Sequence, residues 1–308
     1  GVYGVLMGLV VYFLPEGIVP ASRSWRQRRG ETEEATPTPG SPTTADPGRA
    51  YVFYGGSLGL GASTLLADPE QQAGAQFGGA VAGAGDVNGD GLYEVIVGSP
   101  TYDAGGGFSD HGRAYLYSGV AGGIGGTPAS VLSQAQAGAQ FGASVAGAGD
   151  VDGDGYSVVL IGIPDHDATA TDAGRAVLFR GGLLGLEQTP VWDVTVDPAT
   201  SLHFGEAVGT SGDVNGDGLS DVLVGTQLAV AYAFWGGAAG PSVVPDWSHA
   251  GTAGSNFGRA LAGTDINGDG TPETKQQILD LIRGVAPSAG DVDLANDRRG
   301  VSARFTYT

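Results

Sequence analysis

The strongest constraint on this chain is a pattern that occurs four times: a Phe-Gly pair followed, eight or nine residues later, by a loop rich in Asp and Gly. The pairs begin at Phe77, Phe141, Phe204 and Phe257, which are separated by 64, 63 and 53 residues. A repeat of this length is a structural unit that cannot bury its apolar face alone and must stack on its neighbours. The chain is therefore expected to fold as a series of similar units.

Each loop has the ligand spacing that suits calcium. The pattern D-x-[DN]-x-[DN]-G provides side-chain oxygens at positions 1, 3 and 5 and a Gly at position 6 for the sharp turn. A backbone carbonyl at position 7 and a carboxylate at position 9 bring the set towards the roughly six to eight oxygens that calcium prefers. The chain is therefore predicted to bind two to four Ca²⁺ ions. The predicted ligands are Asp86, Asn88, Asp90, Leu92 and Glu94; Asp150, Asp152, Asp154 and Tyr156; Asp213, Asn215, Asp217, Leu219 and Asp221; and Asp265, Asn267, Asp269, Thr271 and Glu273.

The second loop departs from the pattern at position 9, where Val158 replaces a carboxylate. Because calcium affinity follows the charge and number of the ligands, this loop is predicted to bind the ion most weakly. Asp-Gly clusters are also ordinary turn residues, which is the alternative explanation for any single copy. Four copies in the same register favour calcium loops.

These loops are not EF-hands, because position 12 is not acidic in any copy. Each of the first three loops is followed by a short apolar run closed by Gly, at residues 94–98, 158–162 and 221–225. Such runs predict buried strands. Each loop is thus expected to join two strands of one sheet in an all-β fold.

Two more motifs recur in fixed order with the Phe-Gly pairs. A Gly-x-Pro triplet ends the first two apolar runs, at residues 98–100 and 162–164, and has drifted to Gly-Thr-Gln at 225–227. A segment of alternating small and aromatic residues lies at 48–55, 112–119, 174–181 and 229–236. Together these motifs resemble the FG-GAP repeats of the integrin α-subunit β-propeller and of many bacterial exported proteins, over about residues 47–273. The resemblance implies a β-propeller-like array of FG-GAP blades.

The number of repeats predicts an incomplete or small propeller. Propellers typically contain about four to eight blades, whereas this chain holds the end of one unit, two complete units, a shorter third and the start of a fourth. An open arc or a fragment of a larger ring is favoured over a closed four-bladed ring.

The two ends differ from the repeats, which are predicted to form a domain over residues 49–270. Residues 1–21 begin with an uncharged apolar stretch of 14 residues, which as a helix would span about 21 Å, short of a bilayer core of about 30 Å. It could be a signal-peptide core, a membrane anchor or a buried helix, and residues 1–20 are the only predicted membrane contact. Residues 22–48 form an Arg-containing, then Pro/Thr-rich linker. Residues 271–308 are predicted to form a C-terminal helix and tail. The Asp-rich fourth loop that leads into this helix is also similar to dockerin modules.

Composition excludes several classes of function. The net charge of −19 argues against nucleic-acid binding, and the absence of cysteine excludes disulfides and thiol metal sites. The four histidines have no metal-ligand spacing, and the single Gly-x-Ser-x-Gly match, at residues 55–59, is followed by no helix pattern. No enzymatic activity is predicted.

Two functions are consistent with these features. The resemblance implies an exported, non-catalytic calcium-binding propeller that mediates protein or glycan adhesion at the cell surface. The alternative is an accessory propeller of a secreted hydrolase or polysaccharide lyase whose catalytic part lies elsewhere. Fold alone does not decide between them.

Overall fold

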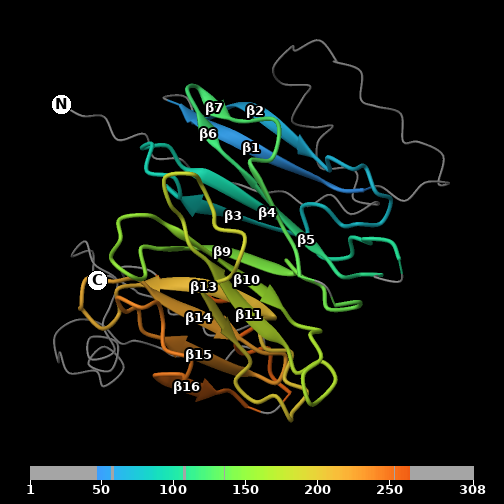
Figure 1. Ribbon diagram of the computed structural model, residues 1–308, viewed down its shortest axis with the longest axis vertical. Coiled ribbons are helices and arrows are strands. Elements are labelled where there is room, and N and C mark those ends of the chain that lie inside the picture. Colours follow the sequence, from blue (N-terminus) through green and yellow to red (C-terminus); the bar gives the residue numbers. More distant parts are fainter. Residues whose placement is uncertain (1–46, 57–58, 107–108, 135, 253, 264–308) are drawn as a thin grey trace, which may run out of the picture.

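The computed structural model describes residues 47–56, 59–106, 109–134, 136–252 and 254–263. All regular secondary structure within these described residues consists of β-strands, which confirms the all-β prediction. Three four-stranded antiparallel sheets follow one another along the chain (Figure 1). The strands of the sheets are β3 (Ala80–Gly85), β4 (Glu94–Ser99), β5 (Arg113–Tyr117) and β8 (Ser130–Leu132); β9 (Ser144–Gly149), β10 (Val158–Ile163), β11 (Arg175–Phe179) and β12 (Trp192–Val194); and β13 (Ala207–Gly212), β14 (Asp221–Gly225), β15 (Val230–Phe234) and β16 (Trp247–Ala250).

In each sheet the strands are ordered as they occur in the chain, so every sheet is a meander. Two smaller antiparallel pairs complete the described strands: β1 (Arg49–Gly56) with β2 (Gly59–Ala67), and the short hairpin β6 (Gly119–Val120) with β7 (Gly123–Ile124). The sequence of β1 matches that of β5, so the β1–β2 pair corresponds to the outer half of a sheet. The repeat unit predicted from the sequence is therefore one four-stranded sheet.

Apolar side chains on both faces of the sheets hold the stack together. In β10, Val159 and Ile161 belong to the cluster shared with the preceding sheet, whereas Val158 and Leu160 belong to the cluster shared with the following sheet. This alternation is the period of two that a strand imposes, and it explains why the run is apolar throughout. Phe141 lies in the first of these clusters. Each unit is thus buried by its neighbours.

The Phe-Gly and Gly-x-Pro motifs interlock neighbouring sheets. The amide of Gly142 donates to the carbonyl of Gly162 in its own unit, at 3.2 Å. The carbonyl of Gly142 packs against Gly98 of the preceding unit, where an added Cβ would lie only 2.0 Å from that oxygen. The same arrangement recurs one unit later, where a Cβ on Gly162 would lie 2.1 Å from the carbonyl oxygen of Gly205. These glycines are required because main chains of adjacent sheets approach too closely for a side chain.

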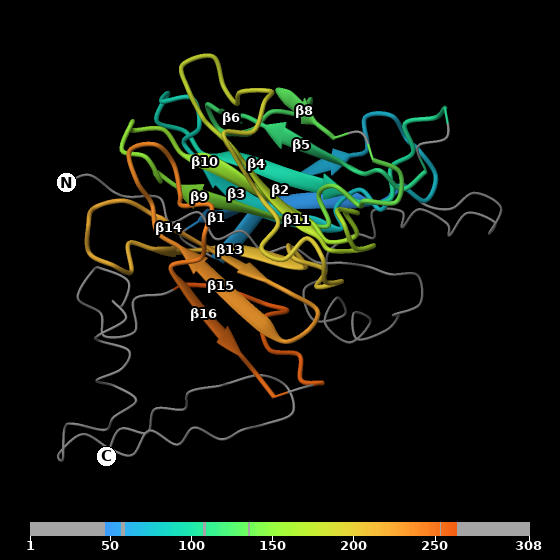
Figure 2. The same cartoon turned by 60° about the horizontal axis from the view of Figure 1, so that its bottom comes forward.

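The sheets form a propeller-like stack. The innermost strands β3, β9 and β13 lie side by side, and the amide of Gly263, in the fourth repeat, donates to Thr210 of β13 at 2.9 Å. Figure 1 places β1–β2 and β13–β16 at opposite ends of this stack, and Figure 2 shows that the sheets are rotated relative to one another.

The predicted N-terminal apolar segment, the linker up to residue 46 and the C-terminal helix lie outside the described residues. Among the residues that the structure describes, no helix has the length and apolar character needed to cross a membrane.

Candidate metal sites

The three described Asp-rich loops occupy equivalent places. Loop 1 (residues 86–94) joins β3 to β4, loop 2 (150–158) joins β9 to β10, and loop 3 (213–221) joins β13 to β14. A shift in strand register accompanies each loop. The residue at position 9 then pairs with the last Gly of the preceding strand in all three cases: Glu94 with Gly85, Val158 with Gly149, and Asp221 with Gly212.

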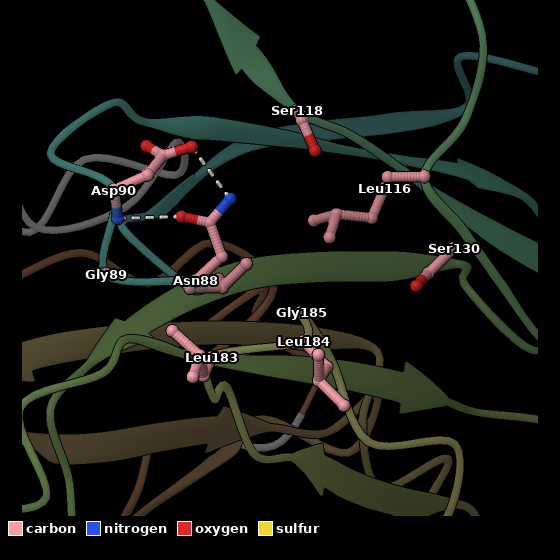
Figure 3. Close-up of a pocket in the computed structure, with 11 residues that line it drawn as sticks. Asn88, Gly89, Asp90, Leu116, Ser118, Ser130, Leu183, Leu184 and Gly185 are labelled. Carbon is pink, nitrogen blue, oxygen red and sulfur yellow. Dashed lines mark hydrogen bonds between the residues drawn. The ribbon is translucent and has the colours of Figure 1, made fainter.

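Loop 1 folds around its first carboxylate. One oxygen of Asp86 accepts the amides of Gly89 and Asp90, at 2.7 and 3.2 Å, and the other accepts the amide of Gly91 at 2.9 Å. Asn88 Oδ1 accepts the amide of Asp90 at 2.9 Å, and Asn88 Nδ2 donates to the Asp90 carboxylate at 3.0 Å (Figure 3). Side-chain oxygens at positions 1, 3 and 5 are therefore gathered on one short turn.

Loop 3 repeats this hydrogen-bond pattern. Asp213 accepts the amides of Gly216, Asp217 and Gly218 at 2.7, 3.0 and 2.7 Å. Asn215 Oδ1 accepts the amide of Asp217 at 2.9 Å, and Asn215 Nδ2 donates to the Asp217 carboxylate at 2.8 Å. Two loops that lie in different units thus reach the same geometry.

The position 9 carboxylates of these two loops are buried. Glu94 is 1% exposed and accepts the amide of Val87 at 2.9 Å, and Asp221 is 0% exposed and accepts the amides of Val214 and Gly236, both at 2.8 Å. Burial raises the pKa of both carboxyl groups above the ordinary value, although the amide hydrogen bonds oppose it. The negative charges of Asp90 and Asp86 raise the pKa of Glu94 further.

A divalent cation fits loops 1 and 3. A buried carboxylate is stable in ionised form only when a positive charge or strong hydrogen bonds compensate for lost hydration. The donors here are all oxygens, which is the chemistry that Ca²⁺ prefers. The donor set of these two loops therefore has the chemistry of a calcium site.

Loop 2 is different. Asp150, Asp152 and Asp154 each bring an oxygen within 4.8 Å of the others. However, the guanidinium of Arg180 forms an ion pair with Asp152, and its Nε lies 3.7 Å from the Asp154 carboxylate. Position 9 is the fully buried Val158. The role of Arg180 was not predicted from the sequence. The signal that could have revealed it is that, of the four aromatic segments, only this one has a basic residue immediately before its final Gly.

The remaining predicted ligands are less defined. The side chains of Tyr156 and Leu219, at position 7, pack over Gly89 and Gly153 of the preceding loops, so that an added Cβ there would lie 2.8 and 3.2 Å away. Leu92 is exposed. The fourth loop, with Asp265, Asn267, Asp269, Thr271 and Glu273, lies outside the described residues.

Main-chain hydrogen bonds join each loop to the next unit. The carbonyl of Asp86 accepts the amide of Ser157 at 2.9 Å, and that of Val87 accepts the amide of Gly182 at 2.8 Å. Loop 2 makes the same two hydrogen bonds: the carbonyl of Asp150 accepts the amide of Ser220 at 2.8 Å, and that of Val151 accepts the amide of Gly237 at 2.9 Å. An ion that orders a loop would therefore also order the junction between two sheets.

A surface hollow of about 390 Å³ lies beside loop 1 (Figure 3). Asn88 and Asp90 line one side of it, and the exposed Leu183 and Leu184 line the other. Ser118 and Ser130 also line the hollow, and no histidine is among its lining residues.

Two of the four histidines lie within hydrogen-bonding distance of protein oxygen atoms. His111 Nδ1 lies 3.1 Å from the carbonyl oxygen of Tyr102, and His203 Nδ1 lies 2.9 Å from Asp165 Oδ1. The strand β2 begins at the last Gly of the Gly-x-Ser-x-Gly match, whereas a nucleophile elbow leads into a helix.

Comparison with known proteins gives the loops a family context. Residues 77–117 match the model of the FG-GAP repeat. This stretch extends from the first Phe-Gly pair through loop 1 to the end of β5. The resemblance to FG-GAP repeat proteins is therefore confirmed.

The chain is also similar to integrin alpha subunits. Integrin alpha-4 of Xenopus laevis is 28% identical over 195 residues, which are 62% of this chain and 18% of that protein. Integrin alpha pat-2 of Caenorhabditis briggsae is 32% identical over 175 residues, 52% of this chain and 14% of that protein. Integrin alpha-IIb of Homo sapiens is 31% identical over 163 residues, 52% of this chain and 15% of that protein. The chain thus matches less than a fifth of the length of these relatives.

Proposed function

We propose that this integrin alpha-like FG-GAP chain is a non-catalytic, calcium-binding β-propeller module that binds a protein or glycan ligand outside the cell. The observation that carries the calcium assignment is the shared geometry of loops 1 and 3. Each gathers oxygens of an Asp, an Asn and a second Asp next to a buried carboxylate whose pKa is raised. The similarity to integrin alpha subunits supports the ligand-binding role and an exported location.

Calcium would stabilise the repeat domain and would have no catalytic role. When bound, the ion supplies positive charge to the buried Glu94 and Asp221. The side chains of Asp86, Asn88 and Asp90 would hold it in loop 1, with the carbonyl of Leu92, and Asp213, Asn215, Asp217 and Leu219 would do so in loop 3. Because the loops hydrogen-bond to the next unit, ion binding would rigidify the repeat domain proposed for residues 49–270.

Calorimetric titration of the metal-free chain with calcium chloride tests the proposal. We expect at least two ions to bind and the melting temperature to fall in excess chelator. Asp213→Asn should remove one ion, because the amide cannot supply the charge of the position 1 ligand. Asp110→Asn is the matched control, since Asp110 is exposed and distant in sequence from the loops. No binding heat and no thermal shift would refute calcium binding.

The ligand-binding part needs a separate experiment. Binding of the calcium-loaded chain to an array of glycans and to immobilised extracellular proteins should be saturable and should weaken in chelator. The same ligands should be recovered chemically unchanged. Turnover of a bound glycan would contradict the non-catalytic assignment.

A further inference from the structure

We infer that the guanidinium of Arg180 takes the place of the metal ion in loop 2, which makes that loop a calcium-independent junction within a calcium-dependent array. The inference concerns the residues of this chain and rests on the proposed calcium binding of loops 1 and 3. It goes beyond the weak calcium affinity expected from Val158, because it assigns a different cation to the loop.

The contacts of Arg180 support this role. Arg180 follows β11 directly, and its side chain reaches back to loop 2, where it pairs with Asp152 and approaches Asp154. The side chain of Asp152 is only 3% exposed. A carboxylate so buried needs a compensating positive charge or strong hydrogen bonds, and the guanidinium of Arg180 supplies the charge.

Two coordinated differences separate loop 2 from its neighbours. At position 9, loops 1 and 3 have Glu94 and Asp221, whereas loop 2 has Val158 in the same strand register. At the residue before the final Gly of the aromatic segment, the flanking units have Ser118 and Trp235, whereas this unit has Arg180. A metal ligand is therefore lost in the same unit that gains a cation.

The position of loop 2 gives the substitution a consequence. The carbonyls of Asp150 and Val151 hold the third sheet through Ser220 and Gly237. Because the side chain of Arg180 cannot dissociate as an ion can, this junction should persist when calcium is removed. The junction between the first and second sheets, held through loop 1, should weaken under the same conditions.

A gain-of-site experiment tests the inference. In the Val158→Asp, Arg180→Ser double variant, loop 2 acquires the carboxylate of loop 3 and the serine of the first unit. Calorimetry should then show one more calcium ion per chain than in the wild type. Arg259→Ser, which removes an exposed arginine, is the control for the loss of an arginine away from loop 2 and should leave the stoichiometry unchanged. An unchanged stoichiometry in the folded double variant, or loss of an ion from the wild type on Asp154→Asn, would overturn the inference.

A second measurement, in chelator, separates failure of this inference from failure of the proposed function. Arg180→Gln should lower the melting temperature of the metal-free chain by about 2–4 °C or more, because Asp152 loses its counter-charge. Adding Asp152→Asn should restore part of that loss. This result would support Arg180 as the internal cation even if loops 1 and 3 bound no calcium. Equal melting temperatures for the wild type and Arg180→Gln would refute it even if loops 1 and 3 bound calcium fully.

Discussion

Replacing Gly98 by Ala should test whether the Gly-x-Pro motif exists to admit the main chain of the next unit. Gly98 lies in β4, and an added Cβ would stand 2.0 Å from the carbonyl oxygen of Gly142. Separations under 3.0 Å are essentially never observed for real Cβ atoms. The obstructing atom belongs to the backbone, so no side-chain rotation can relieve the contact, and the two sheets must move apart by about 1 Å.

The size of the effect follows from the same geometry. Overpacking a well-packed interior costs about 1–3 kcal/mol and occasionally more. Because separation of the sheets would also loosen the apolar cluster around Phe141, we expect the upper end of this range, about 3 kcal/mol. For a domain of this size that corresponds to a melting temperature lower by about 6–12 °C.

The matched control is Gly83→Ala in the same sheet. Gly83 lies in β3 and a Cβ there would meet no atom within 4 Å. Removing a glycine from an unstrained site should be neutral or stabilising by up to about 1 kcal/mol, because it restricts the unfolded chain. Urea denaturation of both variants, followed by circular dichroism, gives the comparison. Equal free energies of unfolding for the two variants would refute the close-approach explanation.

Three further predictions concern the core, the loops and pH. Phe141→Ala should lower the free energy of unfolding by about 3–5 kcal/mol, since it empties a fully buried site between two sheets; a urea midpoint within error of the wild type would contradict this. Glu94→Gln should remove one calcium ion from the calorimetric stoichiometry while leaving loop 3 intact, and an unchanged count would exclude Glu94 as a ligand. Burial, followed by the charge of Arg175, lowers the pKa of His166 below its ordinary value, so the unfolded chain binds a proton more readily and stability falls as pH decreases through about 6.5. In chelator, the melting temperature of His166→Asn should therefore decrease less than that of the wild type between about pH 7 and 5.5. Equal decreases for the two proteins would refute the contribution of His166 to the pH dependence of stability.

Much of the architecture could be predicted from the repeats. The apolar runs after the loops form β4, β10 and β14, and the recurring aromatic segments coincide with most of β1 and with all of β5, β11 and β15. These elements were predictable because their signals are local: apolar residues in a run, or small and aromatic residues in alternation. The short outer strands β8, β12 and β16 have three or four residues each and carry too few positions for a periodic signal.

The contacts of the second loop were harder to predict, because they depend on distances through space. Arg180 is 26 residues from Asp154 in the sequence, and they meet only because β11 runs antiparallel to β10. The loss of a carboxylate at Val158 was visible in the sequence, whereas the compensating cation required knowledge of the strand pairing. Likewise, the motif glycines were recognisable, but the carbonyl oxygen that each one accommodates belongs to another repeat.

The way in which the units join bears on how such a chain can change over evolution. The junctions depend on carbonyls and amides, such as those of Val87 and Gly182, and on glycines such as Gly98. Main-chain atoms are common to all residues, so these junctions depend little on the identity of the flanking residues. Selection should act mainly against side chains added at the glycines. The third unit has Thr226 and Gln227 after its glycine in place of the usual Gly-x-Pro ending, and Gly225 still makes the same close main-chain contacts. Repeats built in this way can diverge at their exposed edges, or be exchanged for one another, without a redesign of their partners.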